Sequence, residues 1–268
     1  MLKRSLSSLS RDLMSYGNRP EKDNSSPVTF SEIAKQYPMA MPSSSDAAIG
    51  VSHFAELGFC PYKSFHHGRG TEKTVTPEAV LALKKGTEYH EKMEAADRAF
   101  AEALPEATLK QLRNPSIDIA EIPELRASIR SGQMFYMSSI ERAGRLNRNL
   151  TIREIKTGRF IGGSDHLLQT WGYCVSAPGI LSANGIVADQ IEWQVDYPHA
   201  GKKLGPFIFS ERALSLLLEA MEQFEALYSV GKAGSGITEL VPVNPAKCRQ
   251  CAFVADCRWA KVSESYGV

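Results

Sequence analysis

The chain has 268 residues, of which 43% are hydrophobic and 23% charged, a composition typical of a soluble globular protein. Its formal net charge of +1 excludes a chain-wide basic field for nucleic acid, so any basic surface must be local. No run approaches the ~18 apolar residues of a transmembrane helix, and the start lacks the apolar core of a secretory signal. We therefore expect a cytoplasmic protein, with a transit peptide as the alternative for the basic, Ser-rich start.

The chain divides by composition into an arm and a domain. Residues 1–45 are polar and rich in Ser, Pro and Asn, which predicts a flexible arm. Residues 46–268 are expected to form one globular domain. At its beginning, a short helix at 51–59 leads into Cys60, and Thr76 is positioned to cap a long helix.

Strand and helix patterns alternate through the rest of the domain. Short, partly alternating segments bounded by Gly, Asn or Pro predict strands, and apolar residues at helical spacing predict helices. The predicted strands are 116–125, 134–146, 150–158 and 188–198, and the predicted helices are 164–181 and 210–231. This order predicts an α/β protein with a central mixed sheet flanked by helices.

The most informative triplet is Glu154-Ile155-Lys156, near the end of a predicted strand. Side chains alternate between the two faces of a strand, so Glu154 and Lys156 point the same way and Ile155 points back into packing. A carboxylate beside an ammonium can hold a divalent cation and stabilise charge that develops on a phosphate. The alternative is an ordinary surface ion pair, worth under ~1 kcal/mol.

Three of the five cysteines, Cys248, Cys251 and Cys257, fall within ten residues. In a chain without a secretion signal, such a cluster favours metal binding over disulfide bonds. The spacing fits zinc as well as an iron–sulfur cluster, because thiolates serve both. The fourth ligand is either Cys60 or Cys174, and Cys174 lies in an apolar setting typical of a buried thiol.

Two pairs of residues accompany the Glu-x-Lys triplet. Gln169 and Tyr173 lie four residues apart in a predicted helix and share one face. Gly86 and His90 have the same spacing in the earlier helix, where a lone histidine is often structural. With these motifs in this order, the sequence resembles the RecB-type nucleases of the PD-(D/E)XK superfamily. Together with the cysteines, it resembles their iron–sulfur branch, above all the CRISPR-associated exonucleases of the Cas-four type.

The resemblance implies a role for each matching residue. The implied ligands of an Mg²⁺ or Mn²⁺ ion are His90, Glu154 and the carbonyl of Ile155. Lys156 is implied as the catalytic lysine, and Gln169 and Tyr173 as residues that position DNA or support that lysine. Oxygen ligands with one imidazole suit these ions better than zinc.

The family carries an aspartate on the strand before the Glu-x-Lys strand, and this sequence departs from that pattern. The best match is Glu141, thirteen residues before Glu154, as a further metal ligand and catalytic carboxylate. Asn147 is a rival alignment, but it leaves too few residues for a strand to turn and return, and Asp118 is a third alternative. Glutamate has one more methylene than aspartate, so activity is expected to be weakened, to prefer Mn²⁺ or to be lost.

Basic and aromatic residues near the motifs are candidates for DNA contacts. Arg145, Arg148 and Arg159 belong to a local concentration of positive charge that would attract a phosphate backbone, the alternative being a solvated hairpin. Tyr89 and Trp171 lie beside the candidate catalytic residues and either stack on bases of a single strand or pack in the core.

The resemblance also selects among the cysteine alternatives. Its members carry one cysteine before the nuclease core and three after it, which implies a [4Fe–4S] cluster held by the residues Cys60, Cys248, Cys251 and Cys257. The implied fold is a restriction-endonuclease-like core in which this cluster clamps the two ends of the domain together. Cross-linking residues 188 apart would stabilise the fold by about 4–5 kcal/mol if the chain-entropy model for disulfides applies.

The expected function is that of a metal-dependent DNA exonuclease acting on single-stranded ends. The resemblance implies prespacer trimming during CRISPR spacer acquisition, with the CRISPR integrase complex as partner. Two alternatives remain open at this point: a related nuclease of phage or DNA repair, and a DNA-binding or assembly module whose catalytic site has weakened.

Overall fold

A six-stranded mixed sheet forms the centre of the structure, a computed structural model of the α/β class. The structure describes residues 6–43, 46–71, 84, 119–146, 148–157, 163–236, 248 and 251–257. The strands are β1 Ala47–Gly50, β2 Ile119–Ser131, β3 Met134–Leu146, β4 Asn149–Ile155, β5 Ile191–Tyr197 and β6 Lys202–Ile208. β1 runs parallel to β3, and β4 runs parallel to β5, whereas the pairs β2–β3, β3–β4 and β5–β6 are antiparallel.

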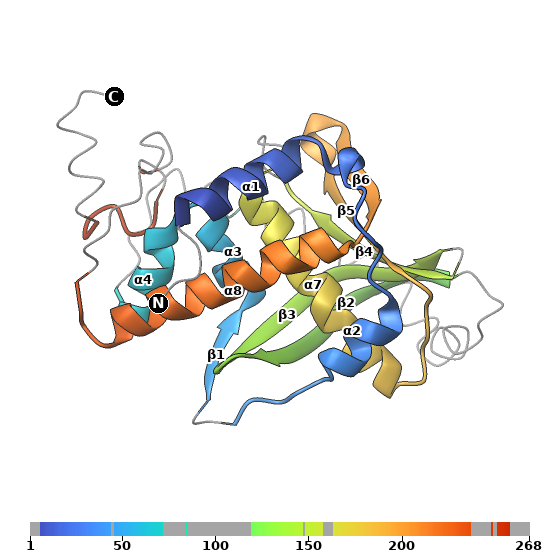
Figure 1. Cartoon of the computed structure of the whole chain (residues 1–268), viewed down its shortest axis with the longest axis horizontal. Helices are drawn as coiled ribbons and strands as arrows, with labels where there is room; N and C mark the ends of the chain where they lie inside the picture. The colour runs from blue at the N-terminus through green and yellow to red at the C-terminus, as the bar shows by residue number, and fades with distance from the viewer. Residues whose placement is uncertain are drawn as a thin grey trace.

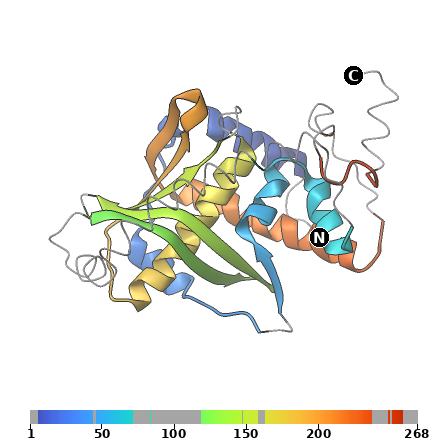
Figure 2. The same ribbon diagram turned by 180° about the vertical axis from the view of Figure 1, so that it is seen from behind.

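Helices cover one face of this sheet (Figures 1 and 2). The central one is α7, which packs directly on β2, β3, β4 and β5 and is flanked by α1, α2 and α8. The helices among the described residues are α1 Leu6–Asn18, α2 Phe30–Gln36, α3 Val51–Ala55, α4 Pro61–Arg69, α7 Ser164–Ala183 and α8 Glu211–Lys232, with short 3₁₀ turns η1 Pro20–Lys22, η2 Glu56–Gly58 and η3 Pro198–Ala200. Within the described ranges, no helix is long and apolar enough to cross a membrane.

The pairing of β1, β2 and β4 with β3 determines where the carboxyl ends of β1 and β4 lie. β2 pairs along almost the whole of one edge of β3, so β1 and β4 must share the other edge. β1 pairs with residues 134–137 and runs parallel to β3, whereas β4 pairs with residues 142–146 and runs antiparallel. The carboxyl ends of β1 and β4 therefore point toward each other, and β5 ends beside β4. Crevices at the carboxyl ends of strands are where open α/β sheets bind ligands.

The prediction of a flexible arm at residues 1–45 is wrong for the described part of that segment. Leu9, Leu13 and Tyr16 recur at helical spacing and are buried, so α1 packs against α7 and α8. α2 is held at its start by a capping box, in which the Thr29 side chain accepts from the backbone N–H of Glu32. Together these helices bring further apolar residues into the main core.

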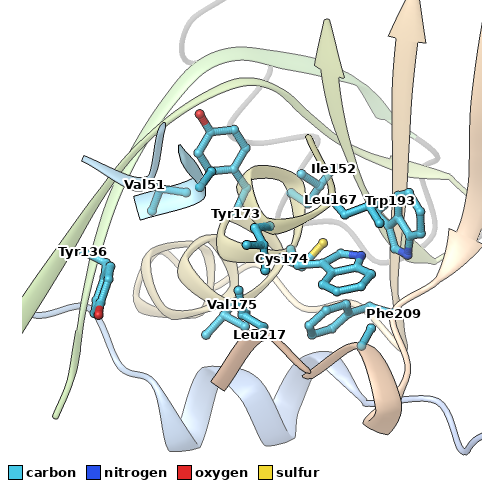
Figure 3. Close-up of a cluster of buried hydrophobic side chains, with 14 of the residues drawn as sticks. Val51, Tyr136, Ile152, Leu167, Tyr173, Cys174, Val175, Trp193, Phe209 and Leu217 are labelled. Carbon is cyan, nitrogen blue, oxygen red and sulfur yellow. The ribbon is translucent and has the colours of Figure 1, made fainter. Parts of the chain in front are cut away.

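The main core lies between α7 and the strands. Figure 3 shows Cys174 of α7 inside a cluster that includes Trp193 of β5 and Phe209. The ring centroids of Trp171 and Trp193 are 6.0 Å apart in an edge-on arrangement, which suits the quadrupoles of aromatic rings. The predicted strands and helices of this region are confirmed, and β3 has the predicted bounds. The predicted long helix that Thr76 caps lies outside the described residues, apart from Lys84.

Candidate functional site

Glu154 is a buried carboxylate at the end of β4. It alternates with Leu150 and Ile152, so it lies on the face of the sheet that α7 covers. Only 1% of the residue is exposed, and its Oε2 atom is buried with no hydrogen-bond partner in the described part of the chain. A buried carboxylate oxygen without a donor is costly, because its lost hydration is not replaced. This oxygen is therefore available to a cation.

Lys156 is fixed by two contacts. Its ammonium Nζ lies 2.7 Å from Oε1 of Glu154, which confirms that the two side chains point the same way. It also donates to Oε1 of Gln169 at 2.6 Å. The Lys156 side chain is 20% exposed, so the ammonium stands between a buried carboxylate and the surface. The contact to Glu154 is thus a charge-assisted hydrogen bond in a partly dry setting, where such bonds are stronger than at an open surface.

Gln169 links Lys156 to Tyr173. The Gln169 side-chain Nε2 donates to the hydroxyl of Tyr173 at 2.7 Å, one turn further along α7, which confirms that the two residues share a face. Tyr173 is itself buried (Figure 3), and a Cβ atom on the preceding residue, Gly172, would lie 2.7 Å from the Val51 side chain of α3. Glu154, Lys156, Gln169 and Tyr173 therefore form one continuous polar chain. The spacing in the sequence predicts the pairing within each element, whereas the contact between Lys156 and Gln169 joins the two elements in space.

Glu141 occupies a register position beside Glu154. The antiparallel ladder between β3 and β4 ends with the pair Arg142 and Arg153, and the next positions along the two strands are Glu141 and Glu154. The side chain of Glu141 lies outside what the structure describes, as does that of Arg145. The backbone thus places the two candidate residues at adjacent positions on neighbouring strands.

Several predicted site residues lie outside the described residues. These are His90, Tyr89 and Arg159, together with the rival alignments Asn147 and Asp118. Ile155 is described as the buried last residue of β4, which matches its predicted packing role. The metal and DNA roles of this group stay predictions.

Two of the residues that were predicted to contact DNA differ in exposure. Trp171 is fully buried between Tyr16 and Trp193, so stacking of this ring on a base is wrong and the core alternative is confirmed. The reason is that Trp171 lies two residues beyond Gln169, on a different face of α7. Arg148 is exposed in the turn before β4 and pairs with Asp189 through two contacts of 3.1 Å.

His166 lies close to the polar chain, and the sequence did not single it out. It lies three residues before Gln169 on α7, so its side chain falls on the same face. Its Nδ1 lies 3.0 Å from the hydroxyl of Tyr197, the last residue of β5. The only signal in the sequence is the spacing His-x-x-Gln-x-x-x-Tyr, which extends the Gln-x-x-x-Tyr pattern by one turn.

The four clustered cysteines are buried thiols in one region. Burial raises the pKa of Cys60 to about 12; the backbone N–H of Tyr62 opposes the rise, and Cys251, Cys257 and Cys248 add to it. For Cys174, burial is the only cause that raises the pKa, and no other cysteine contributes. All five cysteines are free, and the structure therefore groups Cys60 with the three late cysteines and leaves Cys174 in the main core.

Phe253 docks the late cysteine segment on α4. Its ring stacks on His66 at a centroid distance of 5.0 Å and meets His67 edge-on at 5.3 Å. Cys60 immediately precedes α4 as its N-cap residue, so the same short helix holds both parts of the cysteine group. Figures 1 and 2 both show the segment 251–257 beside α4, far in sequence but adjacent in space.

Within the described residues, no set of three or more His, Cys, Asp or Glu side chains is already arranged around a metal position. The candidate metal ligands are nevertheless of two chemical kinds. The buried oxygen of Glu154 is a hard ligand of the kind that Mg²⁺ and Mn²⁺ prefer. The four grouped thiols are soft ligands of the kind that hold zinc or iron–sulfur clusters.

The cysteine region touches the start of α7 directly. A Cβ atom on Gly58 would lie 2.6 Å from the backbone nitrogen of Asp165, closer than real Cβ contacts allow. Gly58 belongs to η2, two residues before Cys60, and Asp165 is in the first turn of α7. The absence of a side chain at Gly58 therefore lets the cysteine region and the helix that carries Gln169 meet at the backbone.

Comparisons with known proteins identify no family. No family model matches the chain, and no curated protein matches it. Thirteen chains among solved structures are similar to it. One of them, the crystal structure of SSO0001, is 14% identical, with 85% of this chain and 93% of that chain covered and a TM-score of 0.47. A likeness at this level carries no argument about function.

Proposed function

We propose that this protein is a metal-dependent nuclease of the RecB-like PD-(D/E)XK type that cleaves phosphodiester bonds in DNA, acting on single-stranded ends. The observation that carries the proposal is the polar chain from Glu154 through Lys156 and Gln169 to Tyr173. It stands at the carboxyl end of β4, where the ends of β1 and β5 also gather. A surface ion pair would need neither a buried carboxylate nor a two-residue support on another helix.

Each residue of the chain has a distinct task in this proposal. Lys156 places a positive charge where a phosphate approaches the surface and stabilises the negative charge that grows on it during cleavage. Gln169 holds the ammonium in position, and Tyr173 holds the amide of Gln169. A group fixed beforehand in this way does not have to reorganise during the reaction, which is the main source of electrostatic catalysis.

Glu154 fits the task of a cation ligand. Its Oε2 is buried without a donor, and Glu141 takes the next register position on β3. These two residues would hold Mg²⁺ or Mn²⁺, with His90 and the carbonyl of Ile155 as the further ligands that the resemblance implies. A divalent cation there would supply Lewis-acid stabilisation of the phosphate charge.

The four cysteines fit a [4Fe–4S] cluster in the same proposal. Cys60 lies at the beginning of α4, and Cys248, Cys251 and Cys257 belong to the segment that Phe253 docks on this helix. Their thiols supply four soft sulfur ligands from the two ends of the domain. Bound there, the cluster would fasten the late segment to α4 and thereby support the start of α7 through Gly58.

We propose CRISPR spacer acquisition in the cytoplasm as the setting, where the nuclease would trim prespacers beside the integrase complex, as the resemblance implies. A related phage or repair nuclease is the alternative setting. An assay on labelled single-stranded DNA with Mg²⁺ or Mn²⁺ tests the activity itself. Metal-dependent cleavage that disappears in Lys156→Ala supports the proposal, and DNA binding without cleavage supports a weakened binding module instead.

A further inference from the structure

Lys63 holds a largely buried ammonium in the first turn of α4, next to the cysteine region. Its backbone N–H donates to the carbonyl of Cys60 at 3.1 Å. Its Nζ lies 3.0 Å from Oε1 of Glu56 and 4.6 Å from the centroid of the Phe59 ring. Only 12% of the side chain is exposed. Because burial of a lysine is costly unless its ammonium is paired, these contacts hold the charge in one place, between Glu56 and the residue that precedes Cys60.

Glu56, the partner of this ammonium, ties the ion pair to both parts of the cysteine group. Its backbone carbonyl accepts the N–H of Cys60 at 2.9 Å. Its second carboxylate oxygen, Oε2, lies 2.8 Å from Nε2 of His67. His67 in turn meets the ring of Phe253 edge-on at 5.3 Å, inside the segment that carries the late cysteines. The ion pair of Lys63 and Glu56 therefore lies where Cys60 and that segment meet.

Both charges of this ion pair act on the thiol of Cys251. Burial raises the pKa of Cys251, and the backbone N–H of Phe253 and the ammonium of Lys63 oppose the rise. The neighbouring Cys257 and the carboxylate of Glu56 add to it, and the effect of Glu56 is weaker than that of Lys63. Negative charge at the cysteines is therefore stabilised by Lys63 and, more weakly, destabilised by Glu56.

We propose that Lys63 and Glu56 set the reduction potential of a redox-active [4Fe–4S] cluster at the four cysteines, with Lys63 as the residue that favours the reduced state. This inference rests on the cluster in the proposed function and adds electron uptake to it. An external one-electron reductant adds one negative charge to the iron, and no bond or proton has to move. A cluster held by four thiolates is already negative, so a fixed cation beside it favours this step and a fixed carboxylate opposes it.

A reductive titration of the anaerobically purified chain tests this inference by a readout other than nuclease activity. Dithionite is the reductant, mediator dyes report the potential, and visible absorption reports the state of the cluster at about pH 8, where imidazole side chains are ordinarily neutral. Lys63→Met keeps the apolar stem and removes the charge, so the midpoint potential should become more negative. The equilibrium constant for reduction should fall by about tenfold, the effect of a unit charge roughly 10 Å away at an effective dielectric constant of about 20.

Three further variants show whether charge is the cause. Lys63→Arg keeps the positive charge and should restore the wild-type midpoint potential. Glu56→Gln removes the opposing charge and should make the midpoint potential less negative, which is the direction opposite to that of Lys63→Met. Lys35→Met changes an exposed lysine of α2 and is the matched control, which should leave the midpoint potential unchanged.

The outcomes separate this inference from the proposed function. A cluster that takes up no electron from dithionite overturns the inference, and so does an unchanged midpoint potential in Lys63→Met. If Lys63→Met and Glu56→Gln shift the midpoint potential in the same direction, altered packing is the cause and the inference also fails. Where Lys63→Met assembles no cluster, Glu56→Gln decides, because a less negative midpoint potential supports the inference and an unchanged one overturns it. If the unmodified chain carries no cluster, the iron–sulfur part of the proposed function fails and the inference falls with it.

Discussion

The ammonium of Lys156 donates a hydrogen bond to the side-chain carbonyl of Gln169 at 2.6 Å, joining the end of β4 to α7. The same ammonium touches Glu154, and the other end of the Gln169 amide is held by Tyr173. The lysine is thus positioned by a carboxylate from its own strand and by an amide from the crossover helix. In the proposed nuclease, the geometry of catalysis depends on this amide as well as on the lysine.

Removal of the amide should therefore lower activity without removing any charge. We expect Gln169→Leu to reduce kcat by about 10- to 100-fold, because a displacement of about 1 Å in a catalytic group can cost that much. Tyr173→Phe removes only the hydroxyl that orients the amide and should have a smaller effect of the same kind. Single-turnover cleavage of labelled DNA measures both variants. Unchanged cleavage by Gln169→Leu would show that the lysine does not need this support.

The cysteine grouping predicts different results for two buried thiols. Cys60→Ser should abolish the iron and sulfide content and the visible absorption of anaerobically purified protein, because it removes one of four grouped ligands. Cys174→Ala is the matched control; it should keep the cluster and lower stability by about 1–2 kcal/mol through a small cavity. A protein that carries zinc and no sulfide would contradict the iron–sulfur proposal, and loss of the cluster in Cys174→Ala would contradict the grouping.

The packed N-terminal helix predicts a contrast between two adjacent residues of α1. Leu13 is 2% exposed and belongs to the main core, so Leu13→Ala should reduce the free energy of unfolding by about 2–5 kcal/mol. Met14 is 52% exposed, and Met14→Ala should change it by less than about 0.5 kcal/mol. Urea unfolding of both variants provides the measurement. Equal, small effects would restore the interpretation of residues 1–45 as a loose arm.

We expect the carboxylate of Glu56 to stabilise the fold at neutral pH and to lose this effect in acid. Burial raises its pKa, but the hydrogen bond to His67 and the charge of Lys63 outweigh burial and lower the pKa to about 2 from 4.5. A lowered carboxyl pKa contributes stability that is present above pH 4.5 and is lost as the pH falls toward 2. This contribution is at most about 3 kcal/mol.

Glu56→Gln should therefore flatten the loss of stability between pH 5 and pH 3, as followed by urea midpoints. Glu222→Gln changes an exposed glutamate of α8 in the same way and should leave the wild-type pH dependence intact. If Glu56→Gln loses as much stability as the wild-type chain over this range, the ion-paired state of Glu56 contributes nothing.

Features of this protein that depend on local spacing were predictable from the sequence. The alternation around Glu154 and Lys156 and the four-residue spacing of Gln169 and Tyr173 predicted contacts that the structure contains. Each motif needs only one strand or one helix to bring its two residues together. The same spacing rule applied to His166 would have found it, but a single helical histidine carries little information until Tyr197 is seen beside it.

Features that depend on tertiary packing were missed. The Ser-rich composition of residues 1–45 hid the helical spacing of Leu9 and Leu13, which becomes meaningful only when α7 and α8 provide a surface to cover. β6 contains Gly205 and Pro206, which are typical of loops, and an edge strand tolerates them because its outer backbone groups need no ladder partner. For Trp171 the sequence left stacking and core packing open, and the choice between them depends on the position of β5 rather than on the helix alone.

The most direct test of the account is cleavage of end-labelled single-stranded DNA by anaerobically purified protein, with Mg²⁺, with Mn²⁺ and with EDTA. The account predicts cleavage that requires a divalent cation and that falls by at least about 100-fold in Lys156→Ala, while circular dichroism shows that this variant is still folded at the assay temperature. Cleavage that is equal in the wild-type and Lys156→Ala proteins, or absent from the wild-type protein with both cations, would contradict it.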